Sequence, residues 1–468
     1  MSRELRQFVR NLSYAFLAQV ISLFLSILMY LIVPKILGVE QFAYWQLFIF
    51  YVSYTGLFHF GIMDGVYLRY GGERYDNLNR SLIGSQIWLM IGWLVIISVV
   101  IILYAFFNMD VPQRKFVWIG LAIYTVLHNI VLFFGFIFQA TNRTKWHSIS
   151  IMIEKTAFIF AVVLMFLWRP DRFEYYVVFY IIAKVLSLLY CASTGREFLL
   201  SKWVSLRETL AAGWRNIRIG FNLTLANLAS TFILGSGRFV VDNAWGINSF
   251  GKFSFAVSLA TFFLNFINQI SIVLFPALRR LKEEEQTEIF IKVRKILTFV
   301  LCGMLLFYMP VKSVLLWWLP AYEESVRYLG ILFPLCIFDG KMQMLYSTYL
   351  KVLRQERYLM KINLLAVGIS MLGGIVSAYV FYSVYGILFS LVIAVIIRSV
   401  LAEQYLTVIL HITFPYESYA EIVLSAFFVV SIMCLHTLPA FLCYAALYVV
   451  YLVVKRRDIY SLKRTYFL

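Results

Sequence analysis

The sequence predicts an all-α integral membrane protein of about fourteen transmembrane helices, and three observations carry that prediction. Hydrophobic residues make up 62% of the 468-residue chain and charged residues only 14%, whereas a typical soluble domain carries roughly 25% charged residues. Apolar runs of about 20 residues, enough to cross a bilayer core ~30 Å thick, recur along the whole chain. No stretch between these runs is long enough to fold as a separate soluble domain.

Each apolar run is expected to be a helix, because lipid cannot satisfy exposed backbone N–H and C=O groups. The runs are also too long for the strands of a membrane barrel. The predicted spans are 12–33, 41–63, 82–107, 115–140, 148–168, 175–195, 217–241, 248–276, 292–318, 326–350, 360–383, 385–410, 419–436 and 438–454.

An internal repeat organises these spans. At an offset of 208 residues, Gly38 aligns with Gly246, and the polar Gln19 aligns with Asn227. Six spans precede the second copy, and an even number gives both copies the same orientation, as in parallel transporter repeats. The predicted domains are a six-helix lobe at 1–195, a cytoplasmic linker at 196–216, a second six-helix lobe at 217–410, and two extra helices with a basic tail at 411–468.

The net charge of +17 is explained by membrane topology. When loops are assigned to alternate sides, 28 of the 41 Lys and Arg residues lie on one side and 8 on the other. The positive-inside rule then predicts that both termini are cytoplasmic. The excess charge favours anionic headgroups of membrane lipids as partners, and no folded module presents it to a nucleic acid. Arg10, Arg69 and Arg218 are expected at the cytoplasmic mouth of the bundle.

Polar residues recur at helical spacing along three predicted spans. A polar stripe across a span faces either a water-filled cavity or a neighbouring helix, because lipid offers it no partner. Contacts between helices through Ser, Thr and Asn are the alternative for any single residue. For the stripes as a set, the sequence favours a cavity lined by Gln19, Asn227, Asn265, Asn268 and Gln269.

Charged residues inside spans are a sharper signal, because each costs at least ~2.5–3.5 kcal/mol unless it faces a cavity or a partner. Lys184 and Arg398 lie nearest the predicted midplane, with no opposite charge at i±3 or i±4. Their interpretation as cargo-binding residues competes with a cross-helix ion pair. The basic cavity candidates are Lys155, Lys184, Arg238, Lys341 and Arg398, and the acidic candidates for ion coupling are Asp339 and Glu403. An excess of basic residues favours an anionic cargo, and arginine suits phosphate.

Motifs for catalysis, metals and nucleotides are not found in the sequence. The five cysteines fall in apolar segments without zinc-ligand spacing. No phosphate-binding loop of the G-x-x-x-x-G-K type and no H-E-x-x-H pattern occur. The chain is therefore expected to be a transporter and not an enzyme, with no catalytic residues, metal site or cofactor.

Three segments resemble Wzx-type polysaccharide flippases of the multidrug/oligosaccharidyl-lipid/polysaccharide exporter superfamily. The stretch 34–45 is similar to the turn after their first helix, 61–69 to the end of their second, and Phe138-Gln139 followed by Arg143 to the end of their fourth. Ala43 stands where the family commonly has glycine. The similarity covers 1–410, and 419–454 matches only as a hydrophobic pair.

The resemblance implies a flippase in the bacterial inner membrane. Its cargo would be an undecaprenyl-pyrophosphate-linked oligosaccharide for capsule, O-antigen or exopolysaccharide. The pyrophosphate would meet Lys and Arg, and the sugars would meet Asn, Gln, Ser and aromatic edges. Other polysaccharide-assembly proteins are candidate partners. Two alternatives remain: a cation-coupled exporter of small molecules on the same fold, and a membrane polysaccharide polymerase or ligase, which the short outer loops disfavour.

Overall fold

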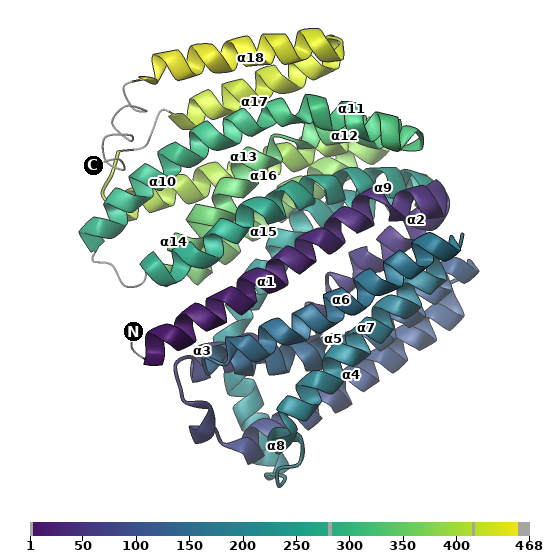
Figure 1. The fold of residues 1–468 in the computed structure, drawn as a ribbon, viewed down its shortest axis with the longest axis vertical. Coiled ribbons are helices and arrows are strands. Elements are labelled where there is room, and N and C mark those ends of the chain that lie inside the picture. The colour runs from purple at the N-terminus through teal and green to yellow at the C-terminus, as the bar shows by residue number, and fades with distance from the viewer. Residues whose placement is uncertain (1–2, 279–282, 414–416, 457–468) are drawn as a thin grey trace. The chain divides into compact units, whose positions relative to one another are not determined.

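The computed structural model describes residues 3–278, 283–413 and 417–456, with the side chains of 3–10, 12, 266–278, 283–284 and 417 left outside this description. Within these ranges the chain forms helices joined by short turns and contains no strand (Figure 1). The prediction of an all-α membrane protein is confirmed by this architecture.

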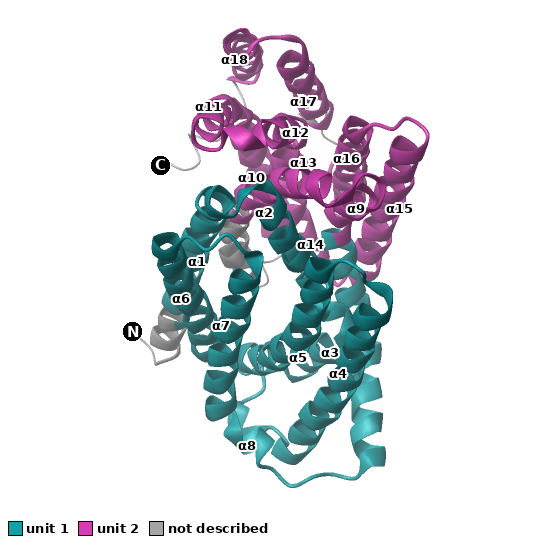
Figure 2. Cartoon of the chain, turned by 90° about the vertical axis from the view of Figure 1, so that its right-hand side faces the viewer, with its two compact units in different colours: residues 1–231 teal, residues 232–468 magenta. Residues whose placement is uncertain are grey.

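The chain divides into two compact units, coloured separately in Figure 2. Unit 1 is Met1–Thr231. In it α1 packs on α6, α4 on α5, and α7 on both α5 and α6. Its elements are α1 (Arg3–Leu31), α2 (Val33–Val52), η1 (Thr55–His59), α3 (Ile62–Tyr70), η2 (Tyr75–Asn77), α4 (Arg80–Asn108), α5 (Pro112–Ala140), α6 (Thr144–Trp168), α7 (Phe173–Thr194), α8 (Arg196–Leu199) and the first part of α9 (Leu206–Leu278).

Unit 2 is Phe232–Leu468. In it α15 packs along α16, and α13 contacts both α10 and α16, while α17 contacts α18 and α10. Its elements are the rest of α9, then α10 (Glu283–Met304), η3 (Leu305–Phe307), α11 (Tyr308–Trp318), η4 (Pro320–Tyr322), α12 (Glu323–Leu332), α13 (Leu335–Lys341), the π-helical η5 (Met342–Tyr346), α14 (Ser347–Val352), α15 (Glu356–Tyr379), α16 (Val384–Ile409), α17 (Glu417–Cys434) and α18 (Thr437–Val454).

The predicted count of fourteen spans is not confirmed. Among the described residues, ten helices are long and apolar enough to cross a membrane, or eleven if the bent pair Val33–His59 and Ile62–Tyr70 is one span. The difference has a structural reason. Two predicted spans lie in α9 on either side of the kink at Gly246, and α9 counts once. The predicted span 326–350 is divided among α12, α13, η5 and α14, although the backbone at their junctions stays right-handed helical. The apolar helix at Ser418–Cys434 is short.

Gly38 and Gly246 adopt the same unusual backbone conformation, with φ 69° and ψ 178° at Gly38 and φ 76° and ψ −170° at Gly246. This region is essentially reserved for glycine. Each residue marks a kink between helical segments, and Phe42 and Phe250, four positions later, are both fully buried. The two positions are the ones that the 208-residue offset aligns, so the shared kink supports the internal repeat.

The limits of the compact units differ from those of the predicted lobes. The units meet at Thr231–Phe232, within α9, whereas the repeat places the second lobe at 217–410. The compact units are defined by contacts between residues and not by the sequence repeat. They therefore do not test the predicted lobes, which stay a prediction. The predicted linker 196–216 contains α8 and the first turns of α9, with six residues between them that form no helix.

Candidate functional site

The crossing of α3 and α9 in unit 1 is built from glycines. A Cβ on Gly65 would lie 2.0 Å from the carbonyl oxygen of Asn216, and a Cβ on Gly220 would lie 2.2 Å from the carbonyl oxygen of Gly61. The two backbones are therefore in direct contact, as small residues allow in membrane helices. The pair Gly61 and Gly65 has the i, i+4 spacing of such contacts. This contact brings the side chains at the start of α3 against the middle of α9.

The short helix η1 precedes α3 and is fixed by hydrogen bonds from α4 and α5. Asn129 of α5 donates from Nδ2 to the carbonyl oxygen of Thr55 at 3.1 Å, and Trp93 of α4 donates from Nε1 to that of Phe58 at 3.2 Å. The chain then bends through Gly61, whose φ of 90° is left-handed. The Gly61 N–H donates to Nδ1 of His59 at 3.1 Å. These contacts hold His59 in one orientation at the bend.

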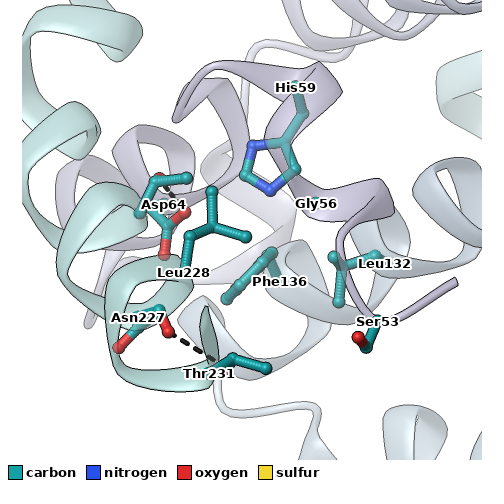
Figure 3. A pocket seen from close by; sticks show the side chains of 10 residues that line it. Ser53, Gly56, His59, Asp64, Leu132, Phe136, Asn227, Leu228 and Thr231 are labelled. Atoms are coloured by element: carbon teal, nitrogen blue, oxygen red, sulfur yellow. Dashed lines mark hydrogen bonds between the residues drawn. The ribbon is translucent and has the colours of Figure 1, made fainter. Parts of the chain in front are cut away.

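A cavity of about 210 Å³ lies between η1, α3, α5 and α9 within unit 1 (Figure 3). Polar side chains from η1, α3 and α9 line it together with apolar ones from α5 and α9. The lining residues are Ser53, Gly56, His59, Asp64, Leu132, Phe136, Thr224, Asn227, Leu228 and Thr231.

The cavity presents both hydrogen-bond donors and acceptors. Asp64, only 5% exposed, accepts a hydrogen bond from the Thr224 hydroxyl. Because Nδ1 of His59 accepts from a backbone N–H, its imidazole is neutral and carries its proton on Nε2. Neither Nε2 of His59 nor the side-chain amide of Asn227 has a hydrogen-bond partner within the described part of the chain. Among the described residues that line the cavity there is no Lys or Arg.

Asn227 is the predicted cavity residue that lines this space, together with Thr224 and Thr231 of the same stripe. The hydroxyl of Thr231 donates to the carbonyl of Asn227 at 3.2 Å, one turn back on its own helix. In the matching stripe of α1, Ser22 and Ser26 likewise donate to carbonyls four residues earlier. Hydroxyls are thus satisfied locally, and the amide is the group left to meet a ligand.

A cluster of charged side chains in unit 1 connects α6 and α7. Glu154 accepts from Lys155 at 3.0 Å through Oε1 and from Lys184 through Oε2. Lys184 also lies 5.4 Å from the ring centroid of Tyr124, and Lys155 lies 5.8 Å from that of Tyr180. Two ammonium groups therefore share one carboxylate. The side chain of Lys155 is 24% exposed and that of Lys184 only 5%.

Three buried ion pairs connect the helices of unit 2. Asp339 of α13 pairs with Arg398 of α16. Arg294 of α10 pairs with Glu403 of α16 at 3.2 Å. Lys341 of α13 then reaches α17, donating to both carboxylate oxygens of Glu421, at 2.7 and 2.9 Å. Asp339 and Lys341, two positions apart, thus contact different helices. Four of the predicted candidates in this unit are each held by an opposite charge: Asp339, Lys341, Arg398 and Glu403.

The remaining predicted residues are placed as follows. Arg238 donates from Nη2 to the hydroxyl of Ser258 at 3.1 Å, across the kink at Gly246. Asn265 is exposed. Gln19 and Arg69 are half-buried, Arg69 against the ring of Tyr70, and Arg218 is exposed. The side chains of Arg10, Asn268 and Gln269 lie outside the described residues.

Four important residues were not among the sequence candidates. His59 was inside a predicted span, but only acidic and basic residues were weighed there. Asp64 lay one residue beyond the predicted end of that span, although structurally it sits in the first turn of α3. Arg294 was counted among the loop charges, and Glu421 was passed over in the short span 419–436. A window extended by one residue at the span end includes Asp64, and a count of every acidic residue inside the spans includes Glu421.

Comparison with known proteins agrees with this architecture. The model of a family described as polysaccharide biosynthesis protein matches residues 8–282, more than half of the chain. The lipid II flippase MurJ in an inward closed conformation superposes with a TM-score of 0.67 and 14% identity, covering 96% of this chain and 99% of that one. An inward-facing multidrug resistance MATE family transporter of the MOP superfamily superposes with a TM-score of 0.63 and 12% identity, covering 84% of this chain and 94% of that one.

A MOP superfamily transporter from Pyrococcus furiosus gives a TM-score of 0.55 at 11% identity, covering 86% of this chain and 95% of that one. No curated protein matches the sequence significantly. At these identities the structural matches show the fold alone. The fold defines the class: a multi-pass membrane protein built like the transporters of the MOP superfamily. Within that class, the chain belongs to the polysaccharide biosynthesis protein family, which confirms the family resemblance found in the sequence.

Proposed function

We propose that this chain is a flippase that moves an undecaprenyl-pyrophosphate-linked oligosaccharide from the cytoplasmic to the outer leaflet. It would do so by alternating access, in the biosynthesis of capsule, O-antigen or exopolysaccharide. The observation that carries the proposal is membership of the polysaccharide biosynthesis family across residues 8–282. A transporter in such a family needs a cargo that is both lipid-soluble and glycosylated, and a lipid-linked oligosaccharide is that cargo.

The distribution of charge supports an anionic cargo in unit 1. In unit 2 the three buried cations described above each have one carboxylate, so their charges are compensated. In unit 1, Lys155 and Lys184 share Glu154 alone. That cluster keeps one positive charge in excess, which is costly inside a membrane unless an anion approaches. We propose that Lys155, the more exposed of the two lysines, contacts the pyrophosphate.

The test is flipping of a fluorescent undecaprenyl-pyrophosphate oligosaccharide by the full chain in proteoliposomes. Accessibility of the label to a membrane-impermeant quencher is measured over time, with protein-free vesicles as the baseline. We expect flipping above that baseline, and a decrease of about 10- to 100-fold in the Lys155→Gln variant, as for a lost charge-assisted hydrogen bond of about 1.5–3 kcal/mol. The control is Lys115→Gln, at the start of α5. Flipping no faster than in empty vesicles would refute the function.

A cation-coupled exporter of small molecules is the second candidate, and Asp64 is the observation that favours it. A buried carboxylate on the wall of a cavity is a group that can bind a cation, and the described residues of this lining include no Lys or Arg. The earlier acidic candidates, Asp339 and Glu403, face arginines instead. Efflux of a cationic dye driven by an imposed ion gradient, and abolished in Asp64→Asn, would support this function over flipping.

We propose that both termini are cytoplasmic in a bacterial inner membrane, from the uneven distribution of Lys and Arg between the two sides. Reporter fusions that score the side of the membrane are expected to be cytoplasmic at positions 75, 205 and 460. An external score at 205 would contradict the even number of spans before the second repeat.

A further inference from the structure

We propose that the unit 1 cavity is a subsite for a single sugar residue of the cargo. The inference rests on the proposed function, because it assigns to one place in unit 1 the carbohydrate part of a lipid-linked oligosaccharide. Three properties of the cavity carry it: the mixture of donors and acceptors, the size, and the absence of Lys and Arg among the described residues that line it. Figure 3 shows these residues around the space.

The hydrogen-bonding groups suit hydroxyls. A sugar hydroxyl both donates and accepts, so a site for it needs both kinds of partner. His59 offers a fixed donor at Nε2, since its Nδ1 is occupied by the Gly61 N–H. Asp64 offers a fixed acceptor, held by Thr224. The amide of Asn227 offers one of each, and Leu132 and Phe136 give the apolar wall that small-molecule sites usually have.

The size suits one ring. At ~30 Å³ per water, the cavity of about 210 Å³ holds about seven waters. It is smaller than the roughly 300–1,000 Å³ of sites for drug-sized molecules. Ser53, Asn227 and Thr231 of its lining are exposed, so one ring of a longer sugar chain can occupy it while the rest of the chain continues outside. It is also much larger than the space that one bare cation occupies.

The chemistry of the lining disfavours a pyrophosphate or a metal cation as the ligand. A pyrophosphate is disfavoured because the described residues that line the cavity include no Lys or Arg to pair with it. A metal cation prefers a shell of oxygen ligands, and the N–H of His59 points a positive dipole at the space instead. A neutral, hydroxylated ring meets every one of these groups favourably.

The test compares two lipids on the full chain in nanodiscs. One is the lipid-linked oligosaccharide isolated from the source cells, and the other is undecaprenyl pyrophosphate without sugar. We expect the wild-type chain to bind the glycosylated lipid about tenfold more tightly. Asn227→Leu removes the amide, and Gly56→Ala places a methyl group 3.6 Å from Nε2 of His59, an ordinary contact that needs no backbone shift. Both variants should reduce the preference below about threefold and leave the Kd of the sugarless lipid unchanged.

Matched controls lie outside the cavity on neighbouring elements. Asn222→Leu, on α9, and Gly92→Ala, where an added Cβ meets nothing within 4 Å, should keep the tenfold preference. Asp64→Asn should keep most of it, because an amide oxygen still accepts from Thr224 and from hydroxyls.

Equal Kd values for the two lipids in the wild-type chain would overturn the inference, and the proposed function would stand if flipping persists. A loss of affinity for both lipids in Asn227→Leu would also overturn it, by showing a structural role. Loss of flipping in Asp64→Asn alone, with the variants at Asn227 and Gly56 unaffected, would overturn it in favour of a cation. Wild-type protein that neither binds nor flips either lipid would refute the proposed function as well.

Discussion

Replacing Arg398 by glutamine is expected to destabilise the folded chain by about 3–5 kcal/mol, the usual effect of removing one partner of a buried ion pair. Arg398 is 1% exposed and pairs with Asp339, which would remain as an uncompensated carboxylate inside unit 2. We expect a sharp fall in the yield of monodisperse protein in detergent and in its thermal unfolding temperature, measured by size-exclusion chromatography and intrinsic fluorescence.

Arg327→Gln provides the matched control. Arg327 pairs with Glu323 at 2.6 Å, but both side chains are well exposed, and such surface pairs contribute only about 0–1 kcal/mol. The exchange Arg398→Asp with Asp339→Arg should restore much of the lost stability. If Arg398→Gln instead folds with a normal unfolding temperature and loses only flipping, then the sequence-based prediction that Arg398 binds the cargo is correct and the pair is secondary.

Replacing Gly65 by alanine is expected to separate α3 from α9. The new Cβ would lie 2.0 Å from the carbonyl oxygen of Asn216, and a backbone atom cannot rotate away as a side chain would. We expect a loss of stability at or above the ~1–3 kcal/mol typical of overpacking. Flipping should fall with it, because the same crossing places Asp64 against Thr224.

The measurement is thermal unfolding of the full chain in one detergent, with flipping measured on the same preparations. Gly92→Ala on α4 is the control, since its Cβ meets open space and alanine is the better helix former by up to about 1 kcal/mol. An unfolding temperature for Gly65→Ala equal to that of Gly92→Ala would show that the α3–α9 contact is looser than the structure has it.

Hydropathy was enough to predict which stretches are helical, because the requirement to satisfy the backbone in lipid acts on each segment separately. The number of spans was harder to predict. Whether 217–241 and 248–276 form two helices or a single kinked one depends on the backbone at Gly246. The apolar content of 326–350 is the same whether it is one helix or the short helices α12 to α14.

The candidate site was only partly predictable. The polar stripe of the seventh span led to Asn227 because helical spacing is a local property. His59 and Asp64 lie about 160 residues earlier in the chain, and only the glycine contact between α3 and α9 brings them to the same cavity. Nothing in the local sequence around either residue shows that contact.

The sequence by itself determined that this is a helical membrane protein with charged residues within its spans, and it predicted an internal repeat and a basic face on one side. The tertiary structure decided what those charges do. A lone cation is unfavourable deep in the membrane, and either an anionic cargo or a carboxylate on another helix can compensate its charge. Glu154 beside Lys184 and Asp339 beside Arg398 follow from which helix faces pack together, and that is a property of the whole bundle.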